Sequence, residues 1–317
     1  MNDRLPDLSD AFALRAAAIE DYRRDGHVVV PGLATAEEVA RFRPGLLRAS
    51  EAAPQREKKP LEERDTYGKA FLQMFNLWRQ NEVARAFVHA RRFARVAAEL
   101  MGVTAVRLYH DQALFKEPAG GATPWHQDQF YWPLQTADTV TLWMPLVPTT
   151  REMGLMTFAS GSQSLGNLGD FAISDASHRE FERLIAEKGL QVAAEAALAP
   201  GDASFHAGWT LHSASSNQTD AMREVMTIIY YADGTLVGPL DHPNRRFDRD
   251  VWLRGCEPGE PAAGPLNPVL YERGEAESRP GFPAATAWGA TRGPPSPASP
   301  PGARRCARAR RRPSETP

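Results

Sequence analysis

His126 and Asp128 are the residues in the chain whose types and spacing first suggest chemistry. They lie two residues apart in the stretch Pro-Trp-His-Gln-Asp-Gln-Phe-Tyr-Trp (124–132). On a β-strand or at its frayed end, residues i and i+2 point to the same side, so this imidazole and this carboxylate could reach one metal ion. They would supply two ligands of a 2-His-1-carboxylate site, which leaves three positions open on Fe(II) for a cosubstrate and O₂.

A second His-x-acid pair, His178 and Glu180, shows how weak this pattern is by itself. With 8 His and 39 acidic residues among 317, about one such pair per chain is expected by chance. The second pair lies in residues 175–188, where Phe181 and Ile185 have helical spacing. Residues two apart in a helix diverge by about 200°, so they cannot bind one ion. We interpret His178 and Glu180 as part of a solvated helix face.

The third ligand should come from a distant strand, and His206 and His212 are the candidates. Arg223 follows His212 by 11 residues, at the start of an apolar stretch. Arginine binds a carboxylate through two hydrogen bonds and stays charged when buried, so Arg223 could fix the second carboxylate of an α-keto diacid bound to the iron. The intervening turn would place Arg223 beside the strand that bears His212. This spacing favours His212 as the ligand, and we interpret His206 as a neighbour of the site or a packing residue.

The N-terminal third of the chain is predicted to be mainly helical. A helix over 9–25 would begin at Ser9 or Asp10 and end at Gly26. Thr35 and Glu38 have the spacing of a capping box and would open a second helix, kinked or broken at Pro44. Further amphipathic helices are predicted over 82–101 and 175–188.

After residue 102 the hydrophobic pattern changes from a helical period to the alternation of strands. Short apolar or alternating stretches are separated by glycine-containing turns, which is typical of a β-barrel or sandwich with helices packed outside it. His110 and Asp111 lie within the first strand, and for them we favour core hydrogen bonding over a substrate role. The predicted strands cover 103–116, 139–147, 191–196, 203–206 and 224–232.

Composition predicts one folded domain over residues 1–279 and a disordered Pro/Arg-rich tail over 280–317. The tail contains seven Arg and one Glu, so with a net formal charge of −2 for the whole chain the remaining residues carry −8. An acidic body argues against nucleic-acid binding. The Arg cluster of the tail is interpreted as solvated, with contact to nucleic acid or anionic lipid as the alternative.

Cysteine usage and hydropathy indicate the cellular context. Cys256 and Cys306 are the two cysteines, too few for a disulfide framework or a zinc-finger set. The N-terminus has no apolar segment of signal-peptide type, and no run approaches the ~18 apolar residues that a membrane helix needs. We therefore expect a cytoplasmic protein with no membrane partner.

Taken together, these motifs resemble the phytanoyl-CoA dioxygenase family of Fe(II)/2-oxoglutarate-dependent oxygenases. The resemblance rests on His126-x-Asp128, His212 and Arg223, and on Trp-His-Gln-Asp-Gln-Phe-Tyr-Trp-Pro (125–133), Thr-Leu-Trp-Met-Pro-Leu (141–146) and Met-Gly-Leu-Met-Thr-Phe-Ala-Ser-Gly-Ser (153–162). It implies a mainly β fold with flanking helices, built on a double-stranded β-helix (jelly-roll, cupin-like) core. The cofactors it implies are Fe(II), 2-oxoglutarate and O₂.

The same resemblance suggests which residues hold 2-oxoglutarate. Gln112 and Trp143 fall where family members line the cosubstrate pocket. Ala214 occupies a position where the family often has a cosubstrate-binding serine, so Ser213 or Ser215 would have to take that role. Because the metal carboxylate Asp128 is present, hydroxylase-type chemistry is favoured over halogenation.

The expected function is hydroxylation of an unactivated C–H bond in a small metabolite or biosynthetic intermediate, with 2-oxoglutarate decarboxylated to succinate. The alternatives are desaturation, epimerisation or cyclisation at the same iron centre, and a non-catalytic jelly-roll binding protein. The expected partner is a small-molecule substrate. No nucleic acid is expected.

Overall fold

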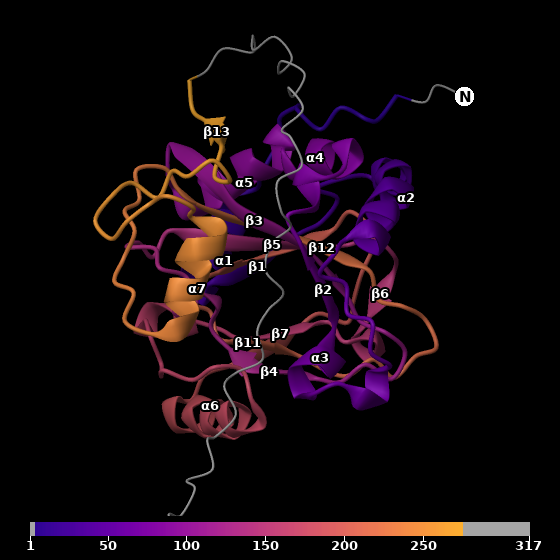
Figure 1. Ribbon diagram of the computed structural model, residues 1–317, viewed down its shortest axis with the longest axis vertical. Helices are drawn as coiled ribbons and strands as arrows, with labels where there is room; N and C mark the ends of the chain where they lie inside the picture. Colours follow the sequence, from indigo (N-terminus) through magenta and orange to yellow (C-terminus); the bar gives the residue numbers. More distant parts are fainter. Residues whose placement is uncertain (1–3, 275–317) are drawn as a thin grey trace, which may run out of the picture. The chain divides into compact units, whose positions relative to one another are not determined.

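A computed structural model describes the structure of residues 4–274 (Figure 1). The predicted tail over 280–317, with its Arg cluster and Cys306, lies outside these described residues. Within them, Cys256 is a buried free thiol.

Antiparallel strands form the centre of the fold, as predicted. The large sheet has the order β1-β10-β5-β12-β3-β13, with β2 paired to β3; a smaller sheet has the order β4-β11-β7-β8, and β6 pairs with β9. The bounds of the large sheet are β1 His27–Val30, β2 Leu72–Phe75, β3 Ala105–Phe115, β5 Thr139–Pro145, β10 Ala203–Ala207, β12 Val225–Ala232 and β13 Val269–Glu272. The other strands are β4 Thr123–His126, β6 Thr149–Thr150, β7 Met156–Ala159, β8 Val192–Ala194, β9 Ala197–Leu198 and β11 His212–Ala214.

One face of the large sheet is apolar and packs against helices. A row of directly opposed residues, Val28, Phe205, Leu142 and Ile228, crosses four strands on this face. These side chains share one buried cluster with Phe93 of helix α5 (Arg91–Met101). Because successive side chains of a strand point to opposite faces, the residues before and after each of these four project from the other face of the sheet.

That opposite face carries more polar residues and is covered by the smaller sheet. Ile229 is opposite Thr141, and Thr141 is opposite His206. Phe158 of β7 lies 5.5 Å from His206 between ring centroids and stacks on His27 at 4.5 Å. We call this side the inner face, because the two sheets face one another across it.

Helices flank the sheets, and several of their ends follow the predicted signals. Gly26 ends α1 with φ of 78°, a left-handed conformation that favours glycine. Thr35 and Glu38 form the predicted capping box at the start of α2. The helices are α1 Ala16–Asp25, α2 Ala36–Ala52, α3 Thr66–Ala70, α4 Glu82–Val88, α5, α6 Asp175–Lys188 and α7 Pro243–Trp252. Figure 1 shows α6 beside β4 of the smaller sheet, away from α2, α4 and α5.

The predicted start of the first helix is wrong, because α1 begins at Ala16 rather than near residue 9. Asp10 does not cap a helix; its carboxylate accepts a hydrogen bond from Arg92 Nε at 2.8 Å. Leu8 is buried, and its carbonyl accepts from the backbone N–H of Arg92 at 3.0 Å. These contacts hold the preceding segment in an extended conformation along α5.

Two other helix predictions also need correction. Of the two outcomes predicted at Pro44, a kink or a break, the break is wrong: α2 is one helix through Pro44, and Phe42 and Leu46 on either side are buried in the same core. The helix predicted over 82–101 is two helices, α4 and α5, separated at Ala90, whose ψ is 111°. That stretch contains neither Gly nor Pro, so the break has no local sequence signal.

No helix within the described part of the chain is long and apolar enough to cross a membrane.

Candidate metal centre and anion pocket

His126 and His212 lie opposite one another on paired strands. His126 ends β4, and His212 begins β11. Their ring centroids are 4.1 Å apart, and both side chains are buried. In each ring Nδ1 lies close to the carbonyl oxygen two residues earlier, at 2.8 Å from Pro124 and 2.9 Å from Thr210. A carbonyl can only accept, so each Nδ1 carries the proton and donates it, which leaves the lone pair on Nε2.

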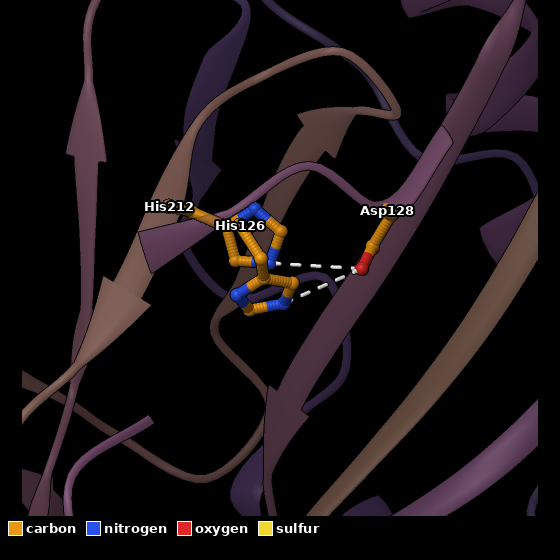
Figure 2. Close-up of side chains that lie close together, drawn as sticks. All are labelled: His126, Asp128 and His212. Carbon is orange, nitrogen blue, oxygen red and sulfur yellow. Dashed lines mark ion pairs between the residues drawn. The ribbon is translucent and has the colours of Figure 1, made fainter. Parts of the chain in front are cut away.

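Asp128 faces both of these lone pairs. It begins the short 3₁₀ turn η3 (Asp128–Phe130) just after β4. Its Oδ1 lies 3.6 Å from His126 Nε2 and 3.8 Å from His212 Nε2, and Figure 2 shows the three side chains pointing toward one another. The pairing of His126 and Asp128 on one side of a strand end is therefore as predicted.

The second carboxylate oxygen of Asp128 is held by the large sheet. Thr141 Oγ1 donates to Oδ2 at 3.1 Å, and His206 Nε2 lies 3.4 Å from the same oxygen. The two oxygens thus face different partners, with Oδ1 toward the ligand histidines and Oδ2 toward the inner face. His206 is a neighbour of the site, as interpreted from its position in the sequence.

The geometry of the three groups fits one metal ion. Their candidate ligand atoms all lie within 4.8 Å of one another. Metal–ligand bonds of about 2.0–2.2 Å at right angles would place ligand atoms about 3 Å apart, so shifts of under ~1 Å would close the site on an ion. No other such cluster of three is found in residues 4–274. Two neutral imidazoles and one carboxylate on one side are the donor set that suits non-haem iron.

The charge states of the ligands also fit. Burial, together with the neighbouring His212, lowers the pKa of His126 to about 4, and burial with His206 nearby lowers the pKa of His212 to about 4. Both rings are therefore neutral near pH 7. Burial alone would raise the pKa of Asp128, but the surrounding imidazoles outweigh it and hold that pKa below its ordinary value. A deprotonated carboxylate beside two neutral imidazoles is ready to bind a cation.

The second His-x-acid pair has no such arrangement. His178 lies in α6, where its Nδ1 accepts from the backbone N–H of Trp125 at 3.1 Å and its Nε2 lies 3.3 Å from Glu182. Glu180 forms an ion pair with Arg183 instead. His178 and Glu180 both lie in the predicted helix, and each contacts a different partner.

Arg223 is a buried cation with no carboxylate partner. The side chain is 2% exposed, and among the ion pairs within residues 4–274 none involves it. Its Nη1 donates to the carbonyl of Gly154, its Nε has no partner, and its guanidinium carbon lies 5.5 Å from the Trp143 ring centroid. Burial lowers the pKa of Arg223 to about 9, so the group remains charged near pH 7.

Lys116 is a second buried basic side chain beside it, and the sequence interpretation missed it. Its Nζ donates to the carbonyls of Gly121 and Ser215, and burial, with a contribution from Arg223, lowers its pKa to about 6. Gly154 lies between the two basic side chains with φ of 86°, and an added Cβ would meet the Ser215 carbonyl oxygen at 2.4 Å. The sequence signal that could have revealed Lys116 is its position directly after the apolar run Ala113-Leu-Phe, at the end of a predicted strand. Two buried basic side chains, neither with a carboxylate partner within the described residues, mark a pocket for an anion, whose binding would favour the protonated form of Lys116.

The predicted position of Arg223 was wrong in one respect. It was expected beside the strand of His212, but β11 pairs with β4 and β7, whereas β12 pairs with β3 and β5 in the other sheet. Arg223 precedes β12 and bridges to Lys116 at the end of β3. The Arg223 side chain still reaches the carbonyl of Gly154, two residues before β7 of the smaller sheet.

The remaining predicted cosubstrate residues divide into two groups. Gln112 and Trp143 lie in one row of the inner face, because both are opposite Thr227. Gln112 Oε1 accepts a hydrogen bond from Gln73 Nε2. Ser213 follows His212 on β11, so alternation turns its side chain away from the ligand, and Ser215 is exposed with its hydroxyl bonded to the Arg151 carbonyl.

Comparison with known proteins identifies the family to which the chain belongs. The profile described as phytanoyl-CoA dioxygenase (PhyH) matches residues 22–225. The chain belongs to the phytanoyl-CoA dioxygenase family. This family member is similar to SnoN, an epimerase from nogalamycin biosynthesis whose structure contains Fe³⁺, alpha ketoglutarate and nogalamycin RO. The identity is 28% and the TM-score 0.67, over 80% of this chain and 97% of that chain.

Two further solved structures share the fold of this phytanoyl-CoA dioxygenase family member. One is SnoK, a non-heme alpha ketoglutarate dependent carbocyclase from nogalamycin biosynthesis, at 24% identity and a TM-score of 0.66, over 81% of this chain and 96% of that chain. The other is EctD from S. alaskensis with 2-oxoglutarate and 5-hydroxyectoine, at 19% identity and a TM-score of 0.61, over 86% of this chain and 93% of that chain. The predicted jelly-roll fold and family resemblance are confirmed, and the fold is that of Fe/2-oxoglutarate-dependent enzymes.

Proposed function

We propose that this chain is an Fe(II)- and 2-oxoglutarate-dependent oxygenase that hydroxylates an unactivated C–H bond of a small molecule. The observation that carries the proposal is the convergence of His126 Nε2, His212 Nε2 and Asp128 Oδ1 on one point. Both Nδ1–H groups are fixed by backbone carbonyls, so the two lone pairs are oriented before any ion binds.

The residues of the chain would hold the metal from one side only. Thr141 and His206 engage Oδ2 of Asp128, so the carboxylate would offer a single oxygen and leave the remaining positions open. Bound Fe(II) would use O₂ and 2-oxoglutarate to insert one oxygen atom into a substrate C–H bond, and the cosubstrate would leave as succinate and CO₂.

Arg223 would bind the distal carboxylate of 2-oxoglutarate. Thr141 contacts Asp128, and Trp143, whose ring lies under the guanidinium, is two residues further along β5. Two residues of a strand span about 7 Å, which a five-carbon diacid can bridge between metal and guanidinium. A bound carboxylate would favour the protonated form of Lys116, which would then add positive charge to this pocket, and Gln112 would line it. The positions of Ser213 and Ser215 do not support the role that the family resemblance suggested for them.

Epimerisation is the second candidate, favoured by the similarity to the epimerase SnoN at 28% identity. The two reactions differ in the composition of the product. Hydroxylation adds one oxygen atom to the substrate, epimerisation leaves its composition unchanged, and desaturation or cyclisation removes two hydrogen atoms. Mass spectrometry of the product distinguishes these outcomes.

The test is aerobic incubation of the protein with Fe(II), 2-oxoglutarate and a panel of metabolites, scored by succinate formation. Asp128→Ala should abolish succinate formation while the protein stays folded, because the carboxylate ligand is lost. Glu180→Ala is the matched control, since it removes the acid of the other His-x-acid pair, and it should retain full turnover. Absence of succinate with the wild-type protein, or full turnover by Asp128→Ala, would contradict the proposal and favour a non-catalytic binding protein.

A further inference from the structure

A row of side chains connects the metal centre with His110 on the inner face. His110 of β3 is opposite Ile229 of β12, which is opposite Thr141 of β5. Directly opposed residues of antiparallel strands project to the same face. Thr141 contacts Asp128, and two strand spacings of about 5 Å separate Thr141 from His110. His110 therefore lies on the inner face about 10 Å across the sheet from the side chain that holds the metal carboxylate.

The surroundings of His110 are aromatic. Its ring centroid lies 4.7 Å from Trp252, 5.1 Å from Tyr109 and 5.5 Å from Phe75, and Phe75 lies 5.0 Å from Trp252. We call His110, Phe75 and Trp252 the aromatic wall. The Phe75 side chain is only partly buried, so part of its ring stays accessible.

His110 is 4% exposed, and its fully buried Nδ1 has no hydrogen-bond partner among residues 4–274. A buried polar atom left unpaired is costly, so the unpaired Nδ1 of His110 on this face requires an explanation. Burial, opposed by the Asp128 carboxylate, lowers its pKa to about 3. The ring is thus neutral and offers one donor and one acceptor.

Helix α7 follows the segment matched by the family profile, residues 22–225, and it contributes Trp252 to the aromatic wall. Its Asp248 is hydrogen bonded to the Tyr109 hydroxyl at 2.8 Å, and burial raises the pKa of Asp248 to about 8. Its N-cap His242 stacks on Phe130, which belongs to the same 3₁₀ turn as Asp128, at 4.5 Å. Helix α7 therefore holds Trp252 in place relative to both β3 and the metal centre.

The three side chains of the aromatic wall are uncharged near pH 7. Asp248 is largely protonated near pH 7, and none of the cation–ring contacts within the described residues involves Phe75, His110 or Trp252. A polyanion such as an acyl-CoA would find no cation among these side chains. Ring faces and edges instead favour offset or edge-on packing with another aromatic ring.

We propose that the aromatic wall is the substrate-binding surface, and that it takes a flat, uncharged aromatic molecule whose hydroxyl or carbonyl group pairs with His110. This inference rests on the proposed function, because it places the substrate beside the metal centre. It assigns His110 a substrate role, where the sequence favoured core hydrogen bonding. Asp111 keeps the core role, with Oδ2 accepting from the Leu77 N–H at 2.9 Å.

The experiment compares 2-naphthol with 2-methylnaphthalene, which has a similar shape but no hydrogen-bonding group. Binding to the wild-type protein loaded with Mn(II) and 2-oxoglutarate is measured from the naphthalene fluorescence. One neutral hydrogen bond contributes about 1 kcal/mol, so 2-naphthol should bind about five- to tenfold more tightly. His110→Phe should lose this preference while binding 2-methylnaphthalene as before, and Trp252→Ala should weaken binding of both compounds.

His89→Phe is the matched control, because His89 is also a histidine packed on a tryptophan, 4.9 Å from Trp78, but lies between α4 and α5. It should leave both affinities unchanged. His110→Asn keeps a hydrogen-bonding group and should retain part of the preference, which provides a second test if His110→Phe does not fold. An unchanged preference in His110→Phe, or no binding of either compound to the wild-type protein, would overturn the inference.

The proposed function can fail separately from this inference. Loss of Mn(II) and 2-oxoglutarate binding would contradict the metal centre, not the aromatic wall. The naphthalene titrations are therefore repeated on metal-free protein, where the preference for 2-naphthol and its loss in His110→Phe should persist. Disappearance of the preference there would contradict the assignment to His110.

Discussion

Replacing Arg223 by methionine should remove the ability of the protein to recognise a dicarboxylic cosubstrate. The guanidinium is buried, has no carboxylate partner within residues 4–274 and has an unpaired Nε, so it is available for one incoming carboxylate. Removing one member of a buried, hydrogen-bonded charge pair costs about 2–5 kcal/mol. At 1.4 kcal/mol per factor of ten, the Kd for 2-oxoglutarate should rise about 30- to 4,000-fold in Arg223→Met.

The assay is a double comparison of protein and cosubstrate on Mn(II)-loaded protein, measured by calorimetry. 2-Oxopentanoate has a methyl group where 2-oxoglutarate has its distal carboxylate. The wild-type protein should prefer 2-oxoglutarate over 2-oxopentanoate by the same factor of about 30 to 4,000. Arg223→Met should bind both acids equally. Arg223→Lys keeps the charge but not the planar fork and should fall between them.

Stability separates this effect from misfolding. Because Arg223 is a buried cation whose pKa is lowered by burial, its removal should leave the ligand-free protein as stable as the wild type or more so. Arg151→Met is the control, since Arg151 is exposed and bonds only backbone carbonyls through its side chain. Retention by Arg223→Met of the wild-type preference for 2-oxoglutarate would refute the role of Arg223.

Three other substitutions test neighbouring parts of the account. Thr141→Val removes the hydrogen bond to Asp128 Oδ2 and should weaken Mn(II) binding about 10- to 100-fold in calorimetry with little change in melting temperature; unchanged affinity would contradict the role of Oδ2. The pKa of Lys116 falls from 10.5 to about 6 on folding, so the unfolded chain binds the extra proton between these values, and stability of the ligand-free protein to urea should rise with pH across that window. Lys116→Met should lower this slope by up to about 1.4 kcal/mol per pH unit, and an unchanged slope would show that Lys116 titrates normally. His178→Ala should leave Mn(II) affinity unchanged and lower stability by about 1 kcal/mol, because its hydrogen bond from the Trp125 N–H and its partly exposed contact with Glu182 are lost.

The sequence was most informative where neighbouring residues determine the geometry. His126 and Asp128 were found because a two-residue spacing at a strand end directs both side chains to one side. The capping box of Thr35 and Glu38 and the helical spacing around His178 are local in the same sense. Each needs only the preferred backbone conformation of a few consecutive residues.

Features that depend on strand pairing could not be read from the sequence. Nothing local predicts that His212 lies opposite His126, or that Thr141 and His206 both reach Asp128. The expected hairpin placed Arg223 beside His212 because the two are close along the chain, whereas their strands belong to different sheets. Long-range register is set by the whole hydrophobic core, and a single chain sequence does not show it directly.

Short elements were missed for a different reason. Strand β11 has three residues, too few to show a period of two, although it carries His212. Helix α7 has Pro243 in its first turn, a usual N-terminal signal, but its polar sequence gave little indication of a buried face. The contacts of Trp252 with His110 and of Asp248 with Tyr109 could therefore be recognised only from the fold.

Anaerobic titration of the protein with Fe(II) in the presence of 2-oxoglutarate tests the central claim most directly. The charge-transfer absorption of an Fe(II)–2-oxoglutarate complex should saturate at one iron per chain in the wild-type protein and in His178→Ala. It should be lost or strongly weakened in His126→Ala, Asp128→Ala and His212→Ala. Absence of this absorption in the wild-type protein, or its full retention in His212→Ala, would contradict the assignment of these three side chains as the metal centre.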